Sequence, residues 1–312
     1  MKIAFIFPGQ GSQYIGMGQD IYNNVPEAKN VFDTANQKLD LDLTNICFNG
    51  PEEELKKTSI TQPAILATSI ACLKLLIREG VKPDMTAGHS LGEYSALVAA
   101  GVIDFSDAIS LVQKRGTFME EAAPHGCGGM AAILGLEKSK VDDACRKASD
   151  TGIVEVANYN CPGQVVISGE LKALEKAMNI CKELGAKRAI PLTVSGPFHS
   201  SLMSLAESKL ANELNLINYK EPIIPVVANV SANYVNTEAN IREALIKQIS
   251  HSVRWDETIE RMIKDGAGIF VEVGPGKVLS GLVKKINKDV HVLNVENIES
   301  LEKVLAKLKE VL

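Results

Sequence analysis

The cysteines of this chain lack the spacing that metal sites and disulfide frameworks need. Six cysteines are scattered over 312 residues, none of them in a C-x-x-C pair, and the five histidines do not cluster. Zinc sites and disulfide-rich folds both require closer, patterned spacing. We therefore expect no metal site, and reduced thiols that pack as small apolar groups in a cytoplasmic protein.

The chain also lacks an excess of positive charge and a long apolar run. The formal net charge is −5, so no global field would hold a nucleic acid. The apolar run at residues 3–7 ends at a Pro-Gly break and is too short for the core of a signal peptide. The stretch 64–77 is interrupted by Thr68, Ser69 and Lys74. We therefore expect no membrane span and no nucleic-acid partner.

What remains is the composition of a globular protein, 46% hydrophobic and 23% charged. Strand and helix patterns alternate along the first part of the chain, which predicts an α/β domain with a mostly parallel sheet. The pattern resumes after residue 200. The expected strands lie at 3–7, 85–87, 223–229, 269–273 and 290–295, and the expected helices at 64–79, 91–100, after Asp104 or Ser106, and at the C-terminal end.

The middle of the chain has a different order of elements, β-α-β-β-α-β, which is the pattern of ferredoxin-like units. Its expected strands are 130–136, 154–158, 164–168 and 188–194, with helices at 140–148 and 171–184. Glycine-rich or Pro-containing segments flank it. We predict a small domain, residues 126–197, inserted into a large domain formed by residues 1–125 and 198–312.

The strongest local motif is G-x-S-x-G at residues 88–92, between an expected strand and an expected helix. In a nucleophile elbow this sharp turn exposes the serine hydroxyl, and the helix N-terminus presents N–H groups to a developing oxyanion. A glycine-rich turn with an N-cap serine would give the same letters. The flanking elements favour Ser90 as a nucleophile.

A serine nucleophile needs a base, and histidine is the usual one. His89 is adjacent to the serine and is expected to form a pocket wall, whereas His291 lies in an expected strand and His125 in the glycine-rich junction. His199 and His251 remain, both in loops before helices, where functional side chains collect. The residues alone leave these two close, with a slight preference for His199.

Two other features have competing explanations. The loop at residues 8–13 follows the first strand but does not match the dinucleotide-binding or P-loop pattern, and neither does the segment 274–277. We therefore expect the loop at 8–13 to direct a backbone N–H at the oxyanion, together with the backbone N–H of Leu91. Arg115 precedes Gly116 near the expected end of a helix. The residues alone favour a role in which Arg115 complements the helix dipole, rather than one in which it clamps a substrate carboxylate.

Six motifs, taken in order, resemble the malonyl-CoA–acyl carrier protein transacylases of fatty acid synthesis. The resemblance runs from about residue 3 to beyond residue 285, and it implies a hydrolase-like α/β domain with a ferredoxin-like insertion. The motifs are PGQGSQ at 8–13, GHSLGE at 88–93, QKRG at 113–116, NCPGQ at 160–164, GPFHS at 196–200 and EVGPGKVL at 272–279.

The resemblance also implies roles for individual residues. The nucleophile falls on Ser90 and the base on His199, and the carboxylate-binding arginine falls on Arg115, which reverses the preference given above. The remaining positions are the oxyanion amides at Gln10 and Leu91, the carbonyl that orients the histidine at Gln248, and a pocket wall at His89 and Asn160. Cys161 stands where serine is frequent in the family, and we expect no effect on the chemistry.

The implied reaction moves a malonyl group from malonyl-CoA to the phosphopantetheine thiol of acyl carrier protein through a malonyl-serine, with no cofactor. Alternatives are a serine thioesterase or esterase, a malonyl-type acyltransferase of a polyketide pathway, and a non-catalytic binding module. We expect a monomer that meets the acidic carrier through basic side chains. The candidates are Lys187, Arg188, Lys277, Lys284 and Lys285.

Overall fold

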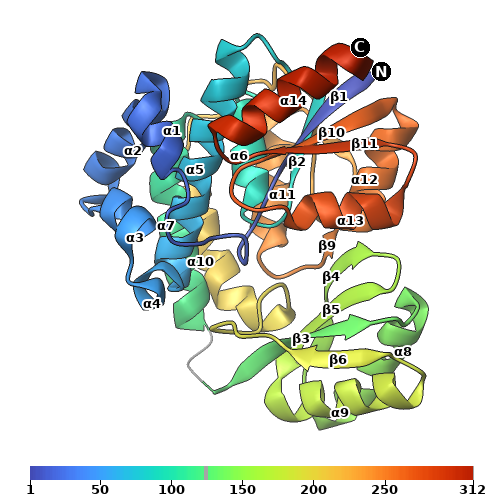
Figure 1. The fold of residues 1–312 in the computed structure, drawn as a ribbon. Helices are drawn as coiled ribbons and strands as arrows, with labels where there is room; N and C mark the ends of the chain where they lie inside the picture. The colour runs from blue at the N-terminus through green and yellow to red at the C-terminus, as the bar shows by residue number, and fades with distance from the viewer. Residues whose placement is uncertain (123–125, 312) are drawn as a thin grey trace.

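Two β-sheets form the frame of the protein in the computed structural model, which describes residues 1–122 and 126–311 (Figure 1). The larger sheet has six strands in the order β11-β10-β1-β2-β7-β8, and all neighbours pair in parallel except β7 and β8. This confirms the predicted α/β class. The strands are β1 (Lys2–Phe7), β2 (Met85–Gly88), β7 (Val226–Val227), β8 (Tyr234–Val235), β10 (Ala267–Val273) and β11 (His291–Val295).

Strand β1 lies inside this sheet and is buried on both faces, as its continuous apolar run predicts. Phe5 and Phe7 belong to one hydrophobic core, and Ala4 and Ile6 belong to another that includes Trp255. Helices α12 (Trp255–Lys264) and α13 (Val278–Ile286) cover the second face. The first face is covered by α1 (Gln19–Asn24), α2 (Pro26–Leu39), α3 (Leu43–Asn49), α4 (Glu52–Leu55), α5 (Thr58–Arg78), α6 (Gly92–Ala99), α7 (Phe105–Ala122), α10 (Ser204–Leu214), α11 (Glu238–Gln248) and α14 (Ile298–Val311).

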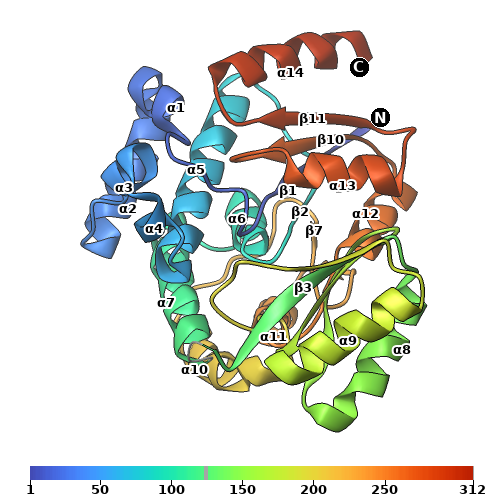
Figure 2. The ribbon, with the colours of Figure 1, turned by 60° about the horizontal axis from the view of Figure 1, so that its bottom comes forward.

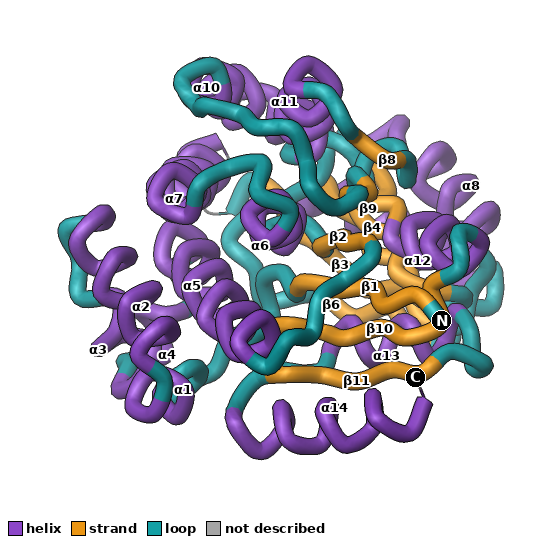
Figure 3. Tube along the Cα trace, turned by 90° about the horizontal axis from the view of Figure 1, so that it is seen from above, coloured by secondary structure: helices purple, strands orange, loops and turns teal. Residues whose placement is uncertain are grey.

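Helix α5 is the longest helix among the described residues and is strongly apolar, and it starts six residues before the predicted position 64. Its mean hydropathy of 1.7 over an 18-residue window and its length would suit a membrane span, but 83% of that window is buried inside the protein. It is packed against α2, α6 and α7. α5 is therefore a core helix, and Figure 3 shows it between α2 and the strands, with α14 beside the edge strand β11.

The smaller sheet has five strands in the order β6-β3-β5-β4-β9. Its first four strands pair antiparallel, and α8 (Lys138–Ala148) and α9 (Leu171–Glu183) lie together against it (Figure 2). This is the predicted β-α-β-β-α-β arrangement, and it confirms the ferredoxin-like part of the fold class. The strands are β3 (Gly128–Leu134), β4 (Val154–Cys161), β5 (Gln164–Glu170), β6 (Arg188–Pro191) and β9 (Val253–Arg254), with a short 3-10 turn, η1, at Ser149–Thr151.

Beyond the earlier start of α5, the structure differs from the prediction in its short strands, and β8 was not expected. β9 comes from the far part of the chain and pairs in parallel with β4, a two-residue strand that the sequence pattern did not indicate. The strand expected at 223–229 shrinks to β7, because Pro222 and Pro225 precede it and proline cannot donate to a ladder. β6 ends at Pro191 rather than at 194. The division into 1–125, 126–197 and 198–312 stays a prediction, and its first boundary lies at residues 123–125, outside the described residues.

Candidate active site

Ser90 lies at the sharp turn between β2 and α6, with a positive φ of 51°. Gly88 and Gly92 allow this turn. A Cβ on Gly92 would lie 2.1 Å from the carbonyl oxygen of Phe7, and one on Gly88 would lie 1.9 Å from the backbone of Gly92. The glycines of the motif are therefore required because the turn and the end of β1 pass in direct backbone contact.

Asn229, two residues after β7, holds this turn in place. Its Oδ1 accepts a hydrogen bond from the Ser90 N–H at 2.7 Å, and its Nδ2 donates to the Gly88 carbonyl at 2.6 Å. The side chain is fully buried. Sequence reasoning missed this residue, although its position at the carboxyl end of the strand expected at 223–229, at the sheet edge where ligand sites form, was the available signal.

His199 is the histidine that reaches the serine. Its Nε2 lies 2.8 Å from Ser90 Oγ, and its Nδ1 lies 2.8 Å from the backbone carbonyl oxygen of Gln248. It sits in the loop before the short 3-10 helix η2 (Ser201–Met203), with a φ of 57°. Because a carbonyl oxygen only accepts, Nδ1 carries the proton and Nε2 is free to accept one.

The surroundings of His199 keep its ring neutral. Burial, followed by the positive charge of Arg115, lowers the pKa of His199 to about 3, while the hydrogen bond to the Gln248 carbonyl acts in the opposite direction. An imidazole in this state is unprotonated at neutral pH and can accept the hydroxyl proton of Ser90.

The explanation of Arg115 as a helix C-terminal residue is wrong. Helix α7 continues to Ala122, seven residues beyond it, and the side chain is only 1% exposed. The guanidinium donates to Gln62 Oε1 at 2.8 Å, to Gln248 Oε1 at 2.9 Å and to Ser90 Oγ at 3.2 Å. Among residues 1–122 and 126–311, no carboxylate forms an ion pair with it.

Among the described histidines, only His199 hydrogen-bonds to the serine hydroxyl. His251 faces Ser250 Oγ and the Lys247 carbonyl through its Nδ1, and His291 is in strand β11. His89 Nε2 lies 2.9 Å from Asn160 Oδ1, so these two expected wall residues touch each other. His125 lies outside the described residues.

A small cavity of about 120 Å³ opens over Ser90. Gln10 and Leu91 line it, and their backbone N–H groups make no hydrogen bond within the described parts of the chain. Its apolar lining includes Met119, Met130, Leu192, Val194 and Phe198, and Asn158 and His89 add polar atoms. The Ser90 hydroxyl thus contacts an imidazole and a guanidinium beside a cavity that two residues with unpartnered N–H groups also line.

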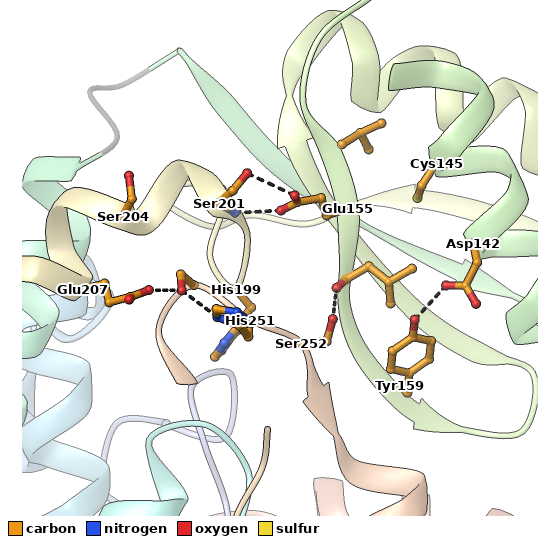
Figure 4. A pocket seen from close by; sticks show the side chains of 13 residues that line it. Asp142, Cys145, Glu155, Tyr159, His199, Ser201, Ser204, Glu207, His251 and Ser252 are labelled. Carbon is orange, nitrogen blue, oxygen red and sulfur yellow. Dashed lines mark hydrogen bonds between the residues drawn. The ribbon is translucent and has the colours of Figure 1, made fainter. Parts of the chain in front are cut away.

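A larger cavity of about 560 Å³ lies behind His199, between β4 with α8 and the segment from η2 to α10 (Figure 4). Its polar groups bond to each other. Glu155 accepts from the N–H and hydroxyl of Ser201, and Asp142 accepts from the Tyr159 hydroxyl at 2.7 Å. It shares only His199 with the smaller cavity. Because the imidazole Nε2 is directed at Ser90, the chemistry belongs to the smaller cavity.

Comparison with known proteins decides the family. The model of the acyl transferase domain matches residues 4–309. A malonyl CoA-acyl carrier protein transacylase of Bacillus subtilis is 51% identical over 310 residues, covering 99% of this chain and 98% of that protein. The chain belongs to the acyl transferase family. The match confirms the resemblance stated from the motifs, and with it the assignment as an acyltransferase.

Solved structures of the same acyl transferase type share the fold throughout. A malonyl CoA-acyl carrier protein transacylase from Clostridium perfringens superposes with a TM-score of 0.97 at 50% identity, covering 100% of this chain and 98% of that one. A malonyl-transacylase in complex with a type II PKS acyl-carrier protein has a TM-score of 0.96 at 46% identity, covering 98% and 100%. In the described part of this acyl transferase, no group of three or more His, Cys, Asp or Glu side chains could hold a metal ion.

Proposed function

We propose that the chain transfers the malonyl group of malonyl-CoA to the phosphopantetheine thiol of an acyl carrier protein, by way of an ester on Ser90. One observation carries the proposal. A fully buried arginine lies 3.2 Å from the nucleophile, and its partners are amide and hydroxyl oxygens rather than a carboxylate. A buried cation with neutral partners favours a substrate that brings its own negative charge. The names of the relatives support the same substrate.

In the first half-reaction, the Ser90 oxygen attacks the thioester carbonyl and His199 Nε2 takes the hydroxyl proton. This general-base step contributes roughly 10²–10⁴-fold. The N–H groups of Gln10 and Leu91 stabilise the tetrahedral oxyanion, on the order of 10²–10³-fold for each donor. The C–S bond then breaks, His199 returns its proton to the departing coenzyme A sulfur, and malonyl-serine remains.

The second half-reaction runs the same steps with a different thiol. His199 takes the proton of the phosphopantetheine thiol, the thiolate attacks the ester carbonyl, and Ser90 leaves with the proton. When the malonyl carboxylate pairs with Arg115, it offsets the positive charge that lowers the pKa of His199. The substrate with the correct charge therefore strengthens the base that acts on it.

Intact-mass measurement after brief mixing with malonyl-CoA tests the proposal. We expect the mass of one malonyl group on the wild-type protein, its removal by a carrier thiol faster than by water, and no added mass on Ser90→Ala. A wild-type protein that never gains mass would overturn the acyl-enzyme and favour a non-catalytic binding module. Discharge to water at the same rate with or without a carrier would favour the thioesterase alternative.

We further propose that the carrier docks on exposed basic side chains of this chain. Lys187 and Arg188 are exposed on the smaller sheet, and Lys284 and Lys285 end α13 on the larger domain. Lys285 Nζ already contacts Gln164 Oε1 at 3.1 Å, which joins the two surfaces. Charge reversal at these lysines should raise the KM for the carrier and leave the malonyl-CoA half-reaction unchanged. An unchanged KM would refute the docking surface. The fatty acid pathway, a monomer and a cytoplasmic location are also proposals.

A further inference from the structure

A buried carboxylate stands next to the site and has no place in the mechanism above. Glu93 lies in the first turn of α6, three residues after Ser90, and is 1% exposed. It does not line the cavity over Ser90. Burial raises the pKa of Glu93 to about 7, against the hydrogen bonds and the Arg115 charge, which favour the ionised form. Burying a carboxylate is costly, so its contacts need an explanation.

Glu93 contacts two residues that hold the catalytic groups. Its Oε2 accepts a hydrogen bond from Gln248 Nε2 at 2.7 Å and from the backbone N–H of Asn229 at 3.2 Å. Asn229 is the residue whose side chain fixes the turn at Ser90. Through Asn229, the carboxylate thus helps to hold the turn at Ser90.

Gln248 connects the same carboxylate to the rest of the site. Its Nε2 also donates to the backbone carbonyl of Ser90 at 2.8 Å, and its Oε1 accepts from Arg115 at 2.9 Å. Its own carbonyl oxygen accepts from His199 Nδ1. One glutamine therefore touches the backbone of the nucleophile, the arginine and the base.

Glu93, the Ser90 carbonyl and Arg115 together hold the Gln248 amide. A carboxylate and a carbonyl oxygen accept hydrogen bonds, and a guanidinium only donates them, so the amide nitrogen faces Glu93 and the Ser90 carbonyl and the amide oxygen faces Arg115. A glutamine at position 93 would replace the charged acceptor by a neutral amide and weaken the hydrogen bond that holds the Gln248 nitrogen, while the other two contacts keep its orientation.

We propose that Glu93 is a positioning residue, which acts through Gln248 and Asn229 to fix Ser90, Arg115 and His199 without touching the acyl group. The inference rests on the proposed ester at Ser90. It predicts that loss of the carboxylate slows the chemical step at each folded active site. A purely structural carboxylate would lower the amount or the stability of folded protein and leave the rate at each site unchanged.

The test measures single-turnover acylation of Ser90 by intact mass, with malonyl-CoA and with acetyl-CoA, normalised to the active fraction. Glu93→Gln should lower the rate constant at saturation about 10- to 100-fold for both acyl groups, the loss expected for a hydrogen bond to a charged group. The KM for malonyl-CoA should change less than about threefold, because the hydrogen bond to Gln62 still holds Arg115, which binds the malonyl carboxylate in the proposed mechanism.

Glu272→Gln is the matched control. Glu272 is also a buried carboxylate, and it accepts the N–H groups of Leu279 and Ser280 at the start of α13, away from the site. This variant should have a lower free energy of unfolding and an acylation rate within about twofold of wild type. Equal slowing in both glutamine variants would overturn the inference.

A second variant covers the case in which Glu93→Gln does not fold. Gln248→Leu removes the amide and keeps the carbonyl that holds His199, so it should slow acylation to a similar extent. In the double variant the two losses should not add, because both break the same link. Additive losses, or a wild-type rate in Glu93→Gln, would refute the positioning role. If wild-type protein itself gained no acyl mass, the proposed function would fail instead.

Discussion

The replacement of Arg115 by alanine separates the recognition of the acyl group from the chemistry of the ester. The guanidinium is 1% exposed and makes three hydrogen bonds, only one of which reaches the nucleophile. Removing one partner of a buried ion pair costs about 3 kcal/mol or more. A malonyl group would lose that pairing, which corresponds to about a 150-fold lower kcat/KM.

An acetyl group has no carboxylate and would lose only the contact between Arg115 and Ser90 Oγ. A long hydrogen bond from a charged donor is worth about 1.5 kcal/mol, or about a 12-fold change. The malonyl-to-acetyl ratio of kcat/KM should therefore fall about 12-fold in Arg115→Ala.

The assay follows acyl transfer to a carrier thiol with each acyl-CoA over a range of concentrations. Lys114→Ala is the control, because Lys114 is the neighbouring cation on α7, is exposed and pairs with Glu213 at 2.7 Å. It should leave the ratio unchanged. Arg115→Lys keeps the charge but loses the planar guanidinium, so its malonyl-to-acetyl ratio should lie between those of the wild type and Arg115→Ala. Equal losses on malonyl and acetyl in Arg115→Ala would remove the clamp from the mechanism.

Two further predictions concern stability. The pKa of His199 is lowered to about 3 in the folded protein, so the unfolded chain binds an extra proton between that value and the ordinary 6.5. In urea melts, the free energy of unfolding of the wild type should therefore fall relative to that of His199→Gln as pH drops through this window, by at most about 1.4 kcal/mol per pH unit. If the free energies of the two proteins changed in parallel with pH, the lowered pKa of His199 would be contradicted. Gly92→Ala should abolish folding or destabilise by about 3 kcal/mol or more, because its Cβ would lie 2.1 Å from the Phe7 oxygen, whereas Gly281→Ala in α13, with open space around it, should be neutral or stabilising in the same melts.

The sequence pattern predicted the elements that are long and strongly periodic. β1, α5, the order of the smaller sheet and the turn at Ser90 all follow from local runs and from glycine, which act within a few residues. The two-residue strands β8 and β9 did not follow in this way, and β7 is shorter than the strand expected at 223–229, because strands this short carry no period. They are fixed by the neighbours with which they pair.

The groups that hold the site escaped prediction for a related reason. Gln62, Asn229 and Glu93 lie 53, 139 and 155 positions from the residues with which they bond in the site. No local pattern marks an amide or a carboxylate as a partner of a residue so distant in the chain. Only the packing of α5 against α7, and of β7 and α11 beside β2 and α6, brings them together.

Arg115 shows how the local and the distant signals conflict. Glycine after a basic residue is the ordinary sign of a helix end, and it led to the dipole explanation. In the structure, Gly116 has another purpose, since a Cβ there would lie 2.6 Å from the Thr58 carbonyl at the start of α5. The glycine lets α7 and α5 approach closely, and this approach places Gln62 where it can hold the guanidinium. The residue that suggested a helix end is thus the one that allows the helix to continue and to carry a charged side chain into the core.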